Sequence, residues 1–584
     1  MVYNTRQLPS LSRTHFGLNL YTLSRQGFTE RALTPRLIAL AAATVARITR
    51  PKKATPLCAL CALLCLFAPS SARDNYPRHT ELDALAYRIH LSIADASDEI
   101  SAETEITFAL KADGVREIPL DFAGLNIDGV TENGRTATFK NASGRLVIAL
   151  GGDSRHSGDL INVTIKYHGA PTDGLFFKRN KFGDRTIFAD NWPNRAHFWF
   201  PSIDHPYDKA KVEFFVNAPA RYDVIANGEL IETTMQRDGT RLTHWREDID
   251  IPVYCMVVGA TEFSILHEGT WNGTRLSYYL YPQDRDRGIH DYGRALRMIE
   301  FYSNLVGDFP FEKLALVESS TRFGGMENSS AIFFDEKAYD GSGRLEGTVA
   351  HEIAHQWFGD SVTESDWHHL WLSEGFATYF AALFLEHAEG RDKFLRLMRA
   401  DKDRYMKDTD AVARPIYDPA VTDLFKLLNN NNYAKGGWVL HMLRRVLGDE
   451  KFFAGIRDYY RTYRNRNALT EDFRRVMELR AGRPLDWFFR EWIYEPGYPI
   501  YDAAWHWDES RKQLHLRIRQ TQKGAAFRMP LDVEFESGDA APRRETVEMS
   551  EREQSFDFKL ERKPQTVALD PDEWVLKVLT MREE

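Results

Sequence analysis

His351-Glu352-Ile353-Ala354-His355, followed after eighteen intervening residues by Glu374, is the stretch that predicts most about this chain. Side chains four positions apart project from the same face of an α-helix, so the two imidazoles are expected to point to one side. Two imidazoles and a carboxylate are a ligand set that suits Zn²⁺ and leaves one coordination position for water. The pattern predicts a zinc site of the catalytic type, with one ion per chain held by His351, His355 and Glu374.

Glu352 lies between the two histidines, where its carboxylate can reach a water on the metal and act as a general base. The same five residues also arise by chance, as two partly exposed helix histidines beside a solvated glutamate. Further motifs are therefore needed to decide between the two interpretations.

Three such motifs are present. The first is Gly324-Gly325-Met326-Glu327-Asn328, the second comprises Trp357-Phe358-Gly359-Asp360 and Trp371-Leu372-Ser373-Glu374-Gly375-Phe376-Ala377, and the third is Tyr433-Ala434-Lys435-Gly436-Gly437. In this order and spacing they resemble the aminopeptidase N family of gluzincin zinc metallopeptidases, which also includes the leukotriene hydrolases. The first motif is similar to the exopeptidase signature GxMEN of that family. The resemblance extends from about Leu85 to about Leu579.

The resemblance implies a zinc-dependent aminopeptidase, a hydrolase that cleaves the N-terminal peptide bond of peptides by means of zinc-activated water. It assigns Glu352 as the general base and Tyr433 as a donor to the oxyanion. The partners would be peptides with a free N-terminus, whose ammonium group a carboxylate near the metal can bind. Substrate binding is predicted for Gly324, Gly325, Met326, Glu327 and Asn328.

The sequence departs from the family pattern at three positions. The family usually supplies a second acidic or amide group to the ammonium, eight residues before the segment that here reads Phe200-Pro201-Ser202-Ile203-Asp204-His205-Pro206, and Trp192 occupies that position. Ser373 stands where Asn is common, and His369 where Asp is common. These changes are expected to affect substrate preference and rate more than the class of reaction.

The zinc motif is also compatible with other functions. A thermolysin-like endopeptidase shares the zinc motif but has no need of the Gly324–Asn328 motif. A leukotriene-type epoxide hydrolase needs a lipid-shaped pocket, which a sequence cannot reveal. A non-catalytic peptide-binding protein on the same scaffold should have lost a metal ligand or Glu352, and all are present.

The predicted fold class is multidomain α+β. Residues 73–263 alternate polar and apolar positions, which predicts an N-terminal antiparallel β domain with one buried face. Residues 264–499 are expected to form a thermolysin-like mixed α/β zinc-peptidase domain. Residues 500–584 are expected to form a small C-terminal β-sandwich-like domain. Many family members continue into a large C-terminal helical domain, which is not expected here.

Helical periodicity in the middle segment predicts six helices, and Ser373 is a plausible N-cap for the helix that carries Glu374. The predicted helices cover residues 345–359, 373–387, 434–447, 451–463, 471–479 and 485–494.

Composition is that of an ordinary globular protein, with 43% hydrophobic and 12% aromatic residues in 584. Residues 1–72 carry nine Lys/Arg and one acidic residue, Glu30, although the whole chain has a net charge of −9. The rest of the chain is therefore acidic, which argues against nucleic acid as a partner.

The N-terminal 72 residues are interpreted as an extension plus signal peptide. Basic residues precede an apolar run, 56–69, that ends in Ser70-Ser71-Ala72. This run is short for a stable membrane span. We expect an exported protein, periplasmic or secreted, and the alternative is a membrane anchor through the apolar run. Three of the four cysteines lie in the run, which leaves Cys255, expected to be buried.

Overall fold

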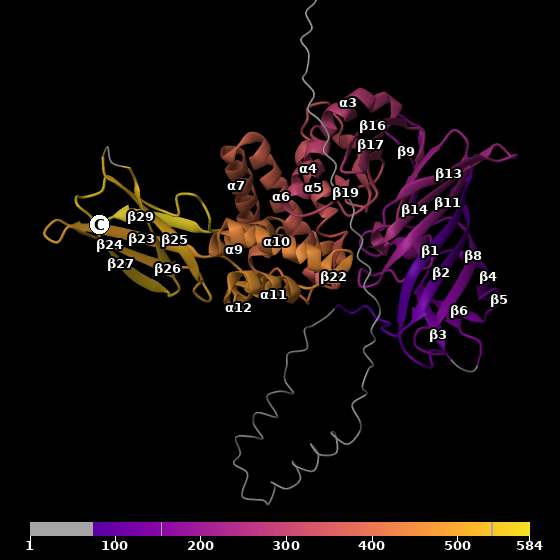
Figure 1. Cartoon of the computed structure of the whole chain (residues 1–584), viewed down its shortest axis with the longest axis horizontal. Coiled ribbons are helices and arrows are strands. Elements are labelled where there is room, and N and C mark those ends of the chain that lie inside the picture. Colours follow the sequence, from indigo (N-terminus) through magenta and orange to yellow (C-terminus); the bar gives the residue numbers. More distant parts are fainter. Residues whose placement is uncertain (1–73, 153–154, 539–540) are drawn as a thin grey trace, which may run out of the picture. The chain divides into compact units, whose positions relative to one another are not determined.

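From Tyr87 onward, every second side chain of the first strand is buried. In the computed structural model, which describes residues 74–152, 155–538 and 541–584 (Figure 1), Tyr87, Ile89 and Leu91 are buried and the side chains between them face outward. Ile161, Val163, Ile165 and Tyr167 repeat the pattern. The predicted alternation is confirmed, and with it a β-rich N-terminal region.

The strands of this region form three sheets. The largest has eight strands in the order β13-β14-β11-β1-β2-β8-β4-β5, the second has the order β12-β15-β10-β9, and the third β3-β7-β6. Neighbours are antiparallel except for β1 and β11, which run parallel. The strands are β1 (Leu82–Ile93), β2 (Ile100–Leu110), β3 (Glu117–Asp121), β4 (Asn126–Glu132), β5 (Arg135–Thr136), β6 (Phe139–Ala142), β7 (Arg145–Ala149), β8 (Leu160–Gly169), β9 (Leu175–Arg179), β10 (Arg185–Ala189), β11 (Lys209–Pro219), β12 (Asp223–Ala226), β13 (Glu229–Met235), β14 (Thr240–Pro252) and β15 (Val258–Thr261).

A five-stranded sheet follows, in the order β16-β17-β18-β20-β19. Its members are β16 (Ser264–Trp271), β17 (Thr274–Leu280), β18 (Lys313–Ser319), β19 (Gly325–Met326) and β20 (Ala331–Asp335). The central strand β18 is parallel to both neighbours and buried along its whole length. The short strand β19, which contains part of the Gly-Gly-Met-Glu-Asn motif, pairs with β20 and lies at the edge of the sheet.

Helices make up most of the chain between β20 and residue 500 (Figure 1). Together with the pair before β18 they are α3 (Arg285–Tyr292), α4 (Ala295–Leu305), α5 (Glu346–His355), α6 (Trp371–Glu389), α7 (Arg391–Lys407), α8 (Thr409–Val412), α9 (Gly436–Leu447), α10 (Asp449–Tyr463), α11 (Thr470–Ala481) and α12 (Asp486–Phe489). Two π-helical turns, η7 (Asn431–Lys435) and η8 (Arg490–Tyr494), adjoin α9 and α12. A two-stranded parallel pair joins β21 (Val362–Glu364) to β22 (Arg466–Ala468).

Helices α5, α6, α9, α10 and α11 confirm five of the six predicted from periodicity, with shifted ends. The sixth, predicted over 485–494, is α12 continued by the π-helical turn η8. Helix α7 was not predicted, because its seventeen residues are mostly charged and only Phe394, Met398 and Tyr405 are buried. The predicted N-cap is wrong. Helix α6 begins at Trp371, so Ser373 lies inside the first turn and its hydroxyl contacts His355 instead of capping the helix.

Residues beyond 499 form two further sheets, ordered β27-β24-β23-β29 and β26-β25-β28. Leu514, Leu516 and Ile518 are buried at alternate positions, as expected. The strands are β23 (Ile500–Asp508), β24 (Gln513–Gln520), β25 (Met529–Glu536), β26 (Arg543–Met549), β27 (Glu553–Lys559), β28 (Thr566–Leu569) and β29 (Val578–Glu583). The boundaries drawn at residues 263 and 499 stay predictions, and the predicted signal peptide lies outside the described residues.

Two glycines allow α6 to approach η7 and α9 at backbone distance. A Cβ on Gly375 would lie 2.9 Å from the backbone of Gly436, and a Cβ on Gly436 would lie 2.9 Å from the Cα of Gly375. Real Cβ atoms do not sit that close, so neither position has room for a side chain. The contact places Tyr433, three residues before Gly436, opposite Glu374.

We predict that Gly436→Ala will destabilise the protein by about 1–3 kcal/mol, because the added methyl forces the two backbones apart. The measurement is the midpoint of thermal unfolding, which should fall. Gly347→Ala in α5 is the matched control, since a Cβ there meets nothing within 4 Å. A midpoint for Gly436→Ala at or above that of the control would contradict the packing argument.

Candidate metal centre

Three predicted ligands converge in the structure. The Nε2 atoms of His351 and His355 are 3.0 Å apart, and Oε2 of Glu374 is 3.1 Å from the first and 3.3 Å from the second. His355 and Glu374 are buried and His351 is partly exposed. Helix α5 supplies both histidines and the first turn of α6 supplies the carboxylate.

The geometry of these donors fits a zinc ion. Tetrahedral ligands at zinc distances of about 2.0–2.1 Å are separated from each other by roughly 3.3 Å. The three separations of 3.0–3.3 Å are close to that value. Two imidazole nitrogens and a carboxylate oxygen are also the donor chemistry that zinc accepts.

Hydrogen bonding at the far side of His355 sets its tautomer. Nδ1 lies 3.1 Å from the carbonyl oxygen of Phe358 and 2.9 Å from Oγ of Ser373. A carbonyl oxygen only accepts, so Nδ1 carries the proton and Nε2 keeps a lone pair for a metal. Ser373 therefore orients a ligand instead of capping the helix.

Glu374 has a partner on each of its oxygens. Oε2 faces the imidazoles, and Oε1 accepts a hydrogen bond of 2.7 Å from the hydroxyl of Tyr433. The ring of Tyr433 also stacks on His351, with centroids 5.9 Å apart. Although burial opposes ionisation of Glu374, the imidazoles of His355 and His351 hold its pKa well below its usual range.

Glu352 lines the same cavity from the middle of α5. A Cβ on Gly325 would overlap its carboxylate, whereas a Cβ on Gly324 would meet nothing within 4 Å. Gly325 is therefore required by close approach to Glu352. Burial raises the pKa of Glu352 well above its ordinary value.

Glu327 follows β19 and is held in place through its backbone. Its carbonyl oxygen accepts a hydrogen bond of 2.6 Å from Nε2 of Gln356, and Nε2 also donates to Asp360 at 2.8 Å. Oε1 of Gln356 accepts from the amide of Ser330 at 2.8 Å, so one side chain clamps both ends of the loop. Burial raises the pKa of Glu327, against the opposing effect of His355.

One cavity of about 80 Å³ brings most predicted site residues together. Its lining includes all three candidate ligands. Gly324 and Asn328 do not line it, and the Asn328 side chain is fully buried without a hydrogen-bond partner among the described residues. The lining residues are Trp192, Phe323, Gly325, Met326, Glu327, His351, Glu352, His355, Glu374, Leu428 and Tyr433.

Sequence reasoning did not identify Gln356, Phe323 or Leu428 as part of the site. Gln356 directly follows His355, and that position was the only signal that could have suggested it. In the sequence, Phe323 and Leu428 look like ordinary core residues, because no local sequence pattern distinguishes an apolar residue that lines a cavity from one in the core. His369, the third departure, accepts hydrogen bonds at Nδ1 from the hydroxyl of Thr470 at 2.8 Å and from its amide at 3.2 Å, and it is not among the residues that line the cavity.

Cys255 is buried, as expected, and its thiol lies 3.5 Å from Oδ1 of Asp360. Burial raises the pKa of this thiol well above its ordinary value, which keeps it protonated and unreactive.

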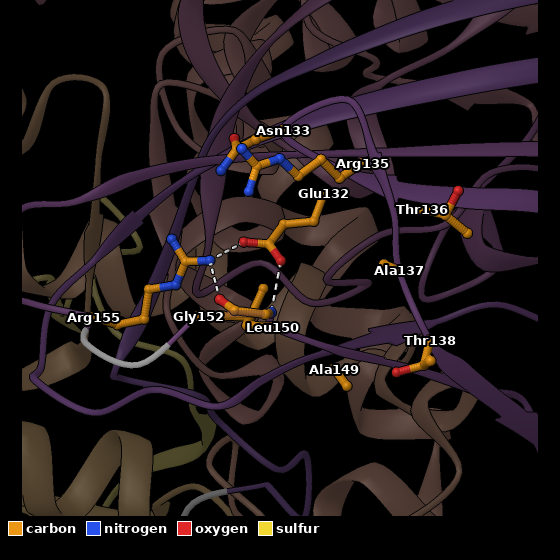
Figure 2. Close-up of a pocket in the computed structure, with 11 residues that line it drawn as sticks. Glu132, Asn133, Arg135, Thr136, Ala137, Thr138, Ala149, Leu150, Gly152 and Arg155 are labelled. Carbon is orange, nitrogen blue, oxygen red and sulfur yellow. Dashed lines mark hydrogen bonds and ion pairs between the residues drawn. The ribbon is translucent and has the colours of Figure 1, made fainter.

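A larger cavity, of about 620 Å³, lies among the N-terminal strands and contains none of these residues (Figure 2). Its one lining carboxylate, Glu132, is ion-paired with Arg155 and accepts a hydrogen bond of 2.7 Å from the amide of Gly151. Size alone therefore does not mark the chemical site.

Comparisons with known proteins identify the family. The profile of the Peptidase M1 N-terminal domain matches residues 83–255, and that of the Peptidase family M1 domain matches residues 291–492. Probable aminopeptidase 2 of Sulfurisphaera tokodaii is 28% identical over 439 residues, which are 72% of this chain and 55% of that protein. Tricorn protease-interacting factor F2 of Thermoplasma acidophilum is 28% identical over 447 residues, 73% of this chain and 55% of its own.

A solved structure shares the fold. The crystal structure of Legionella pneumophila aminopeptidase A in complex with aspartic acid superposes with a TM-score of 0.75 at 17% identity. The alignment covers 88% of this chain and 61% of that one.

The chain belongs to peptidase family M1, the aminopeptidase N family of gluzincins, as the motifs predicted. It spans about half the length of the curated relatives that it matches. Among the described residues, no helix combines the length and the apolar character that a membrane crossing requires.

We predict that Ser373→Ala will weaken zinc binding about 10- to 100-fold, because His355 loses a partner that orients it. Competition with a chromogenic chelator measures the affinity. Ser342→Ala, at an exposed position outside the cavity, is the control and should bind zinc as the unaltered chain does. Equal affinities for the two variants would show that Ser373 has no such role.

Proposed function

We propose that this chain is a zinc-dependent aminopeptidase that removes the first residue of peptides with a free N-terminus. The observation that carries the proposal is one cavity in which a zinc-type donor set, an uncommitted carboxylate and Glu327 meet. A bound zinc ion would polarise the scissile carbonyl and make a water molecule more acidic. His351, His355 and Glu374 would hold it, one ion per chain.

Glu352 is the proposed general base. Its carboxylate lines the cavity and lies within 4.8 Å of ligand atoms of His355 and Glu327. It accepts no hydrogen bond from the described residues, so it can take a proton from the attacking water and pass it to the leaving amine. Its burial favours this role, because a poorly solvated carboxylate binds a proton more readily.

Tyr433 is the proposed donor to the oxyanion. Its hydroxyl now donates to Glu374 and lies in the cavity wall, from which a rotation of the O–H bond would aim it at a bound carbonyl. Removal of such a donor typically costs about a hundredfold or more in rate.

Glu327 is the proposed anchor for the substrate ammonium. A charge-assisted hydrogen bond contributes about 1.5–3 kcal/mol and would place the first peptide bond over the metal donors. The free edge of β19 supports this pose, since Gly325 and Met326 can pair with substrate backbone as an added strand. Gly324 and Asn328 are proposed to shape this loop.

The same proposal includes the predicted organisation, with a β domain at 73–263, a thermolysin-like catalytic domain at 264–499 and a β-sandwich-like domain at 500–584. Export through a signal peptide within residues 1–72 is part of it as well. Mass spectrometry of the mature N-terminus tests the export prediction.

The activity is tested by comparing an alanyl peptide with its N-acetylated form on the zinc-loaded full chain. We expect the acetylated peptide to react about 10- to 100-fold more slowly, because acetylation removes the charge that Glu327 binds. Equal rates would refute amine-directed cleavage.

Glu352→Gln should abolish hydrolysis while zinc remains bound. Glu346→Gln on the same helix, which loses only an ion pair with Arg294, is its control.

Gly325→Ala should lower kcat by about tenfold or more, because the new methyl displaces the Glu352 carboxylate. Gly324→Ala should lower kcat less, since its added methyl meets nothing within 4 Å. Steady-state kinetics on an alanyl amide measures both. Similar losses at the two positions would mean that backbone freedom, and not contact with Glu352, explains the glycine pair.

A further inference from the structure

Trp192 is fixed in the wall of the catalytic cavity by its own loop. The loop follows β10, and Arg195 donates from Nε to the carbonyl oxygen of Trp192 at 2.8 Å. The same guanidinium pairs with Asp190 and, at 2.9 Å, with Asp173. Asn191 ties the loop to the chain beneath it by donating to the carbonyl oxygen of Met256 at 2.7 Å.

Aromatic packing holds the indole ring itself. Phe323, Trp367 and Phe425 lie 5.5–6.2 Å from it and stand nearly perpendicular to it, at 70–90°. Trp192 is 3% exposed and still lines the cavity. Its position beside the metal donors is therefore built into the fold.

Trp192 and Glu327 line the same cavity of about 80 Å³, so a cation bound there has an aromatic wall as well as a carboxylate beside it. Cation–π attraction acts within roughly 6 Å of a ring centroid. Three further lining residues are apolar: Phe323, Met326 and Leu428.

Among the described residues that line the cavity, Glu327 is the one carboxylate left for an ammonium group. Glu374 belongs to the metal donors and Glu352 to proton transfer. A primary ammonium has three N–H donors, and a single carboxylate leaves at least one of them to an aromatic wall. An indole attracts the charge whether or not that position carries hydrogen, as in aromatic cages for methylated ammonium groups.

Neighbouring arginines do not cancel this attraction. Arg322 stacks on Phe323 and Phe425 at 4.9 and 4.6 Å, and Arg195 lies over Phe425 at 5.9 Å. Neither lines the cavity, and both face the carboxylate of Asp190.

We propose that Trp192 makes the ammonium subsite tolerant of N-alkylation, so that peptides with a secondary N-terminal ammonium, from an N-methylated residue or proline, are substrates. The inference rests on the proposed aminopeptidase function. The reaction is unchanged: one water is consumed, the peptide C–N bond after the first residue breaks, and the leaving nitrogen gains a proton. A second carboxylate in place of Trp192 would demand a further N–H and reject such substrates.

The test compares alanine and N-methylalanine as fluorogenic amides, which differ by one methyl group. For the zinc-loaded full chain we expect kcat/KM values within about tenfold of each other. Trp192→Glu and Trp192→Leu should each raise the preference for alanine by about tenfold, and Trp192→Phe, which keeps an aromatic face, should raise it less. Trp507→Leu, in β23, is the control for loss of a tryptophan elsewhere.

The readout is the ratio of kcat/KM for the two substrates, because this ratio does not depend on what fraction of a variant is folded. A preference for alanine of about a hundredfold or more in the unaltered chain, or ratios that Trp192→Leu and Trp192→Glu leave unchanged, would overturn the inference.

Binding separates failure of the inference from failure of the proposed function. Calorimetry on Glu352→Gln should give similar Kd values for the two amides, and much weaker binding of the N-methyl compound would refute tolerance. If the unaltered chain hydrolyses neither amide, the aminopeptidase proposal fails, and the binding comparison still decides the role of Trp192.

Discussion

Contact between α5 and α6 is the constraint on which the metal site depends. One helix carries two imidazoles and the other carries a carboxylate, so a shift of either by one side-chain length would separate donors that are now 3.0–3.3 Å apart. The hydroxyl of Ser373 on α6 also contacts Nδ1 of His355 on α5, which couples helix placement to imidazole orientation. Backbone contact between Gly375 and Gly436 then brings Tyr433 to the far oxygen of Glu374.

The substrate side of the cavity depends on a second constraint, the edge strand β19. Gly325 must lack a side chain because Glu352 occupies the space, and the loop after β19 is clamped by Gln356, which binds the backbone of Glu327 and of Ser330. The proposed base and the proposed ammonium anchor are thus positioned by helix α5 and its C-cap residue, Gln356. The N-terminal strands contribute the remaining wall through Trp192, so strands and helices both shape the place where a substrate would bind.

Much of the architecture was predictable because burial follows local periodicity. Strand β8 alternates over its buried residues and β1 alternates from Tyr87 onward, and the six helices expected from apolar spacing are present. Helix α7 was missed because its buried face consists of three residues among many charges. The cap assigned to Ser373 was wrong because the helix begins two residues earlier and the serine binds a histidine instead.

The sequence by itself determined that two candidate metal donors, His351 and His355, share one helix face, since a spacing of four needs no tertiary information to place two imidazoles there. Only the tertiary structure decided which residues complete the cavity. Tyr433 reaches Glu374 across 59 positions and Gln356 reaches the backbone of Glu327 across 29, and Phe323, Leu428 and Trp192 become cavity walls only when strands and helices pack. Periodicity reports whether a side chain is buried, whereas its partner is set by long-range packing that no local pattern encodes.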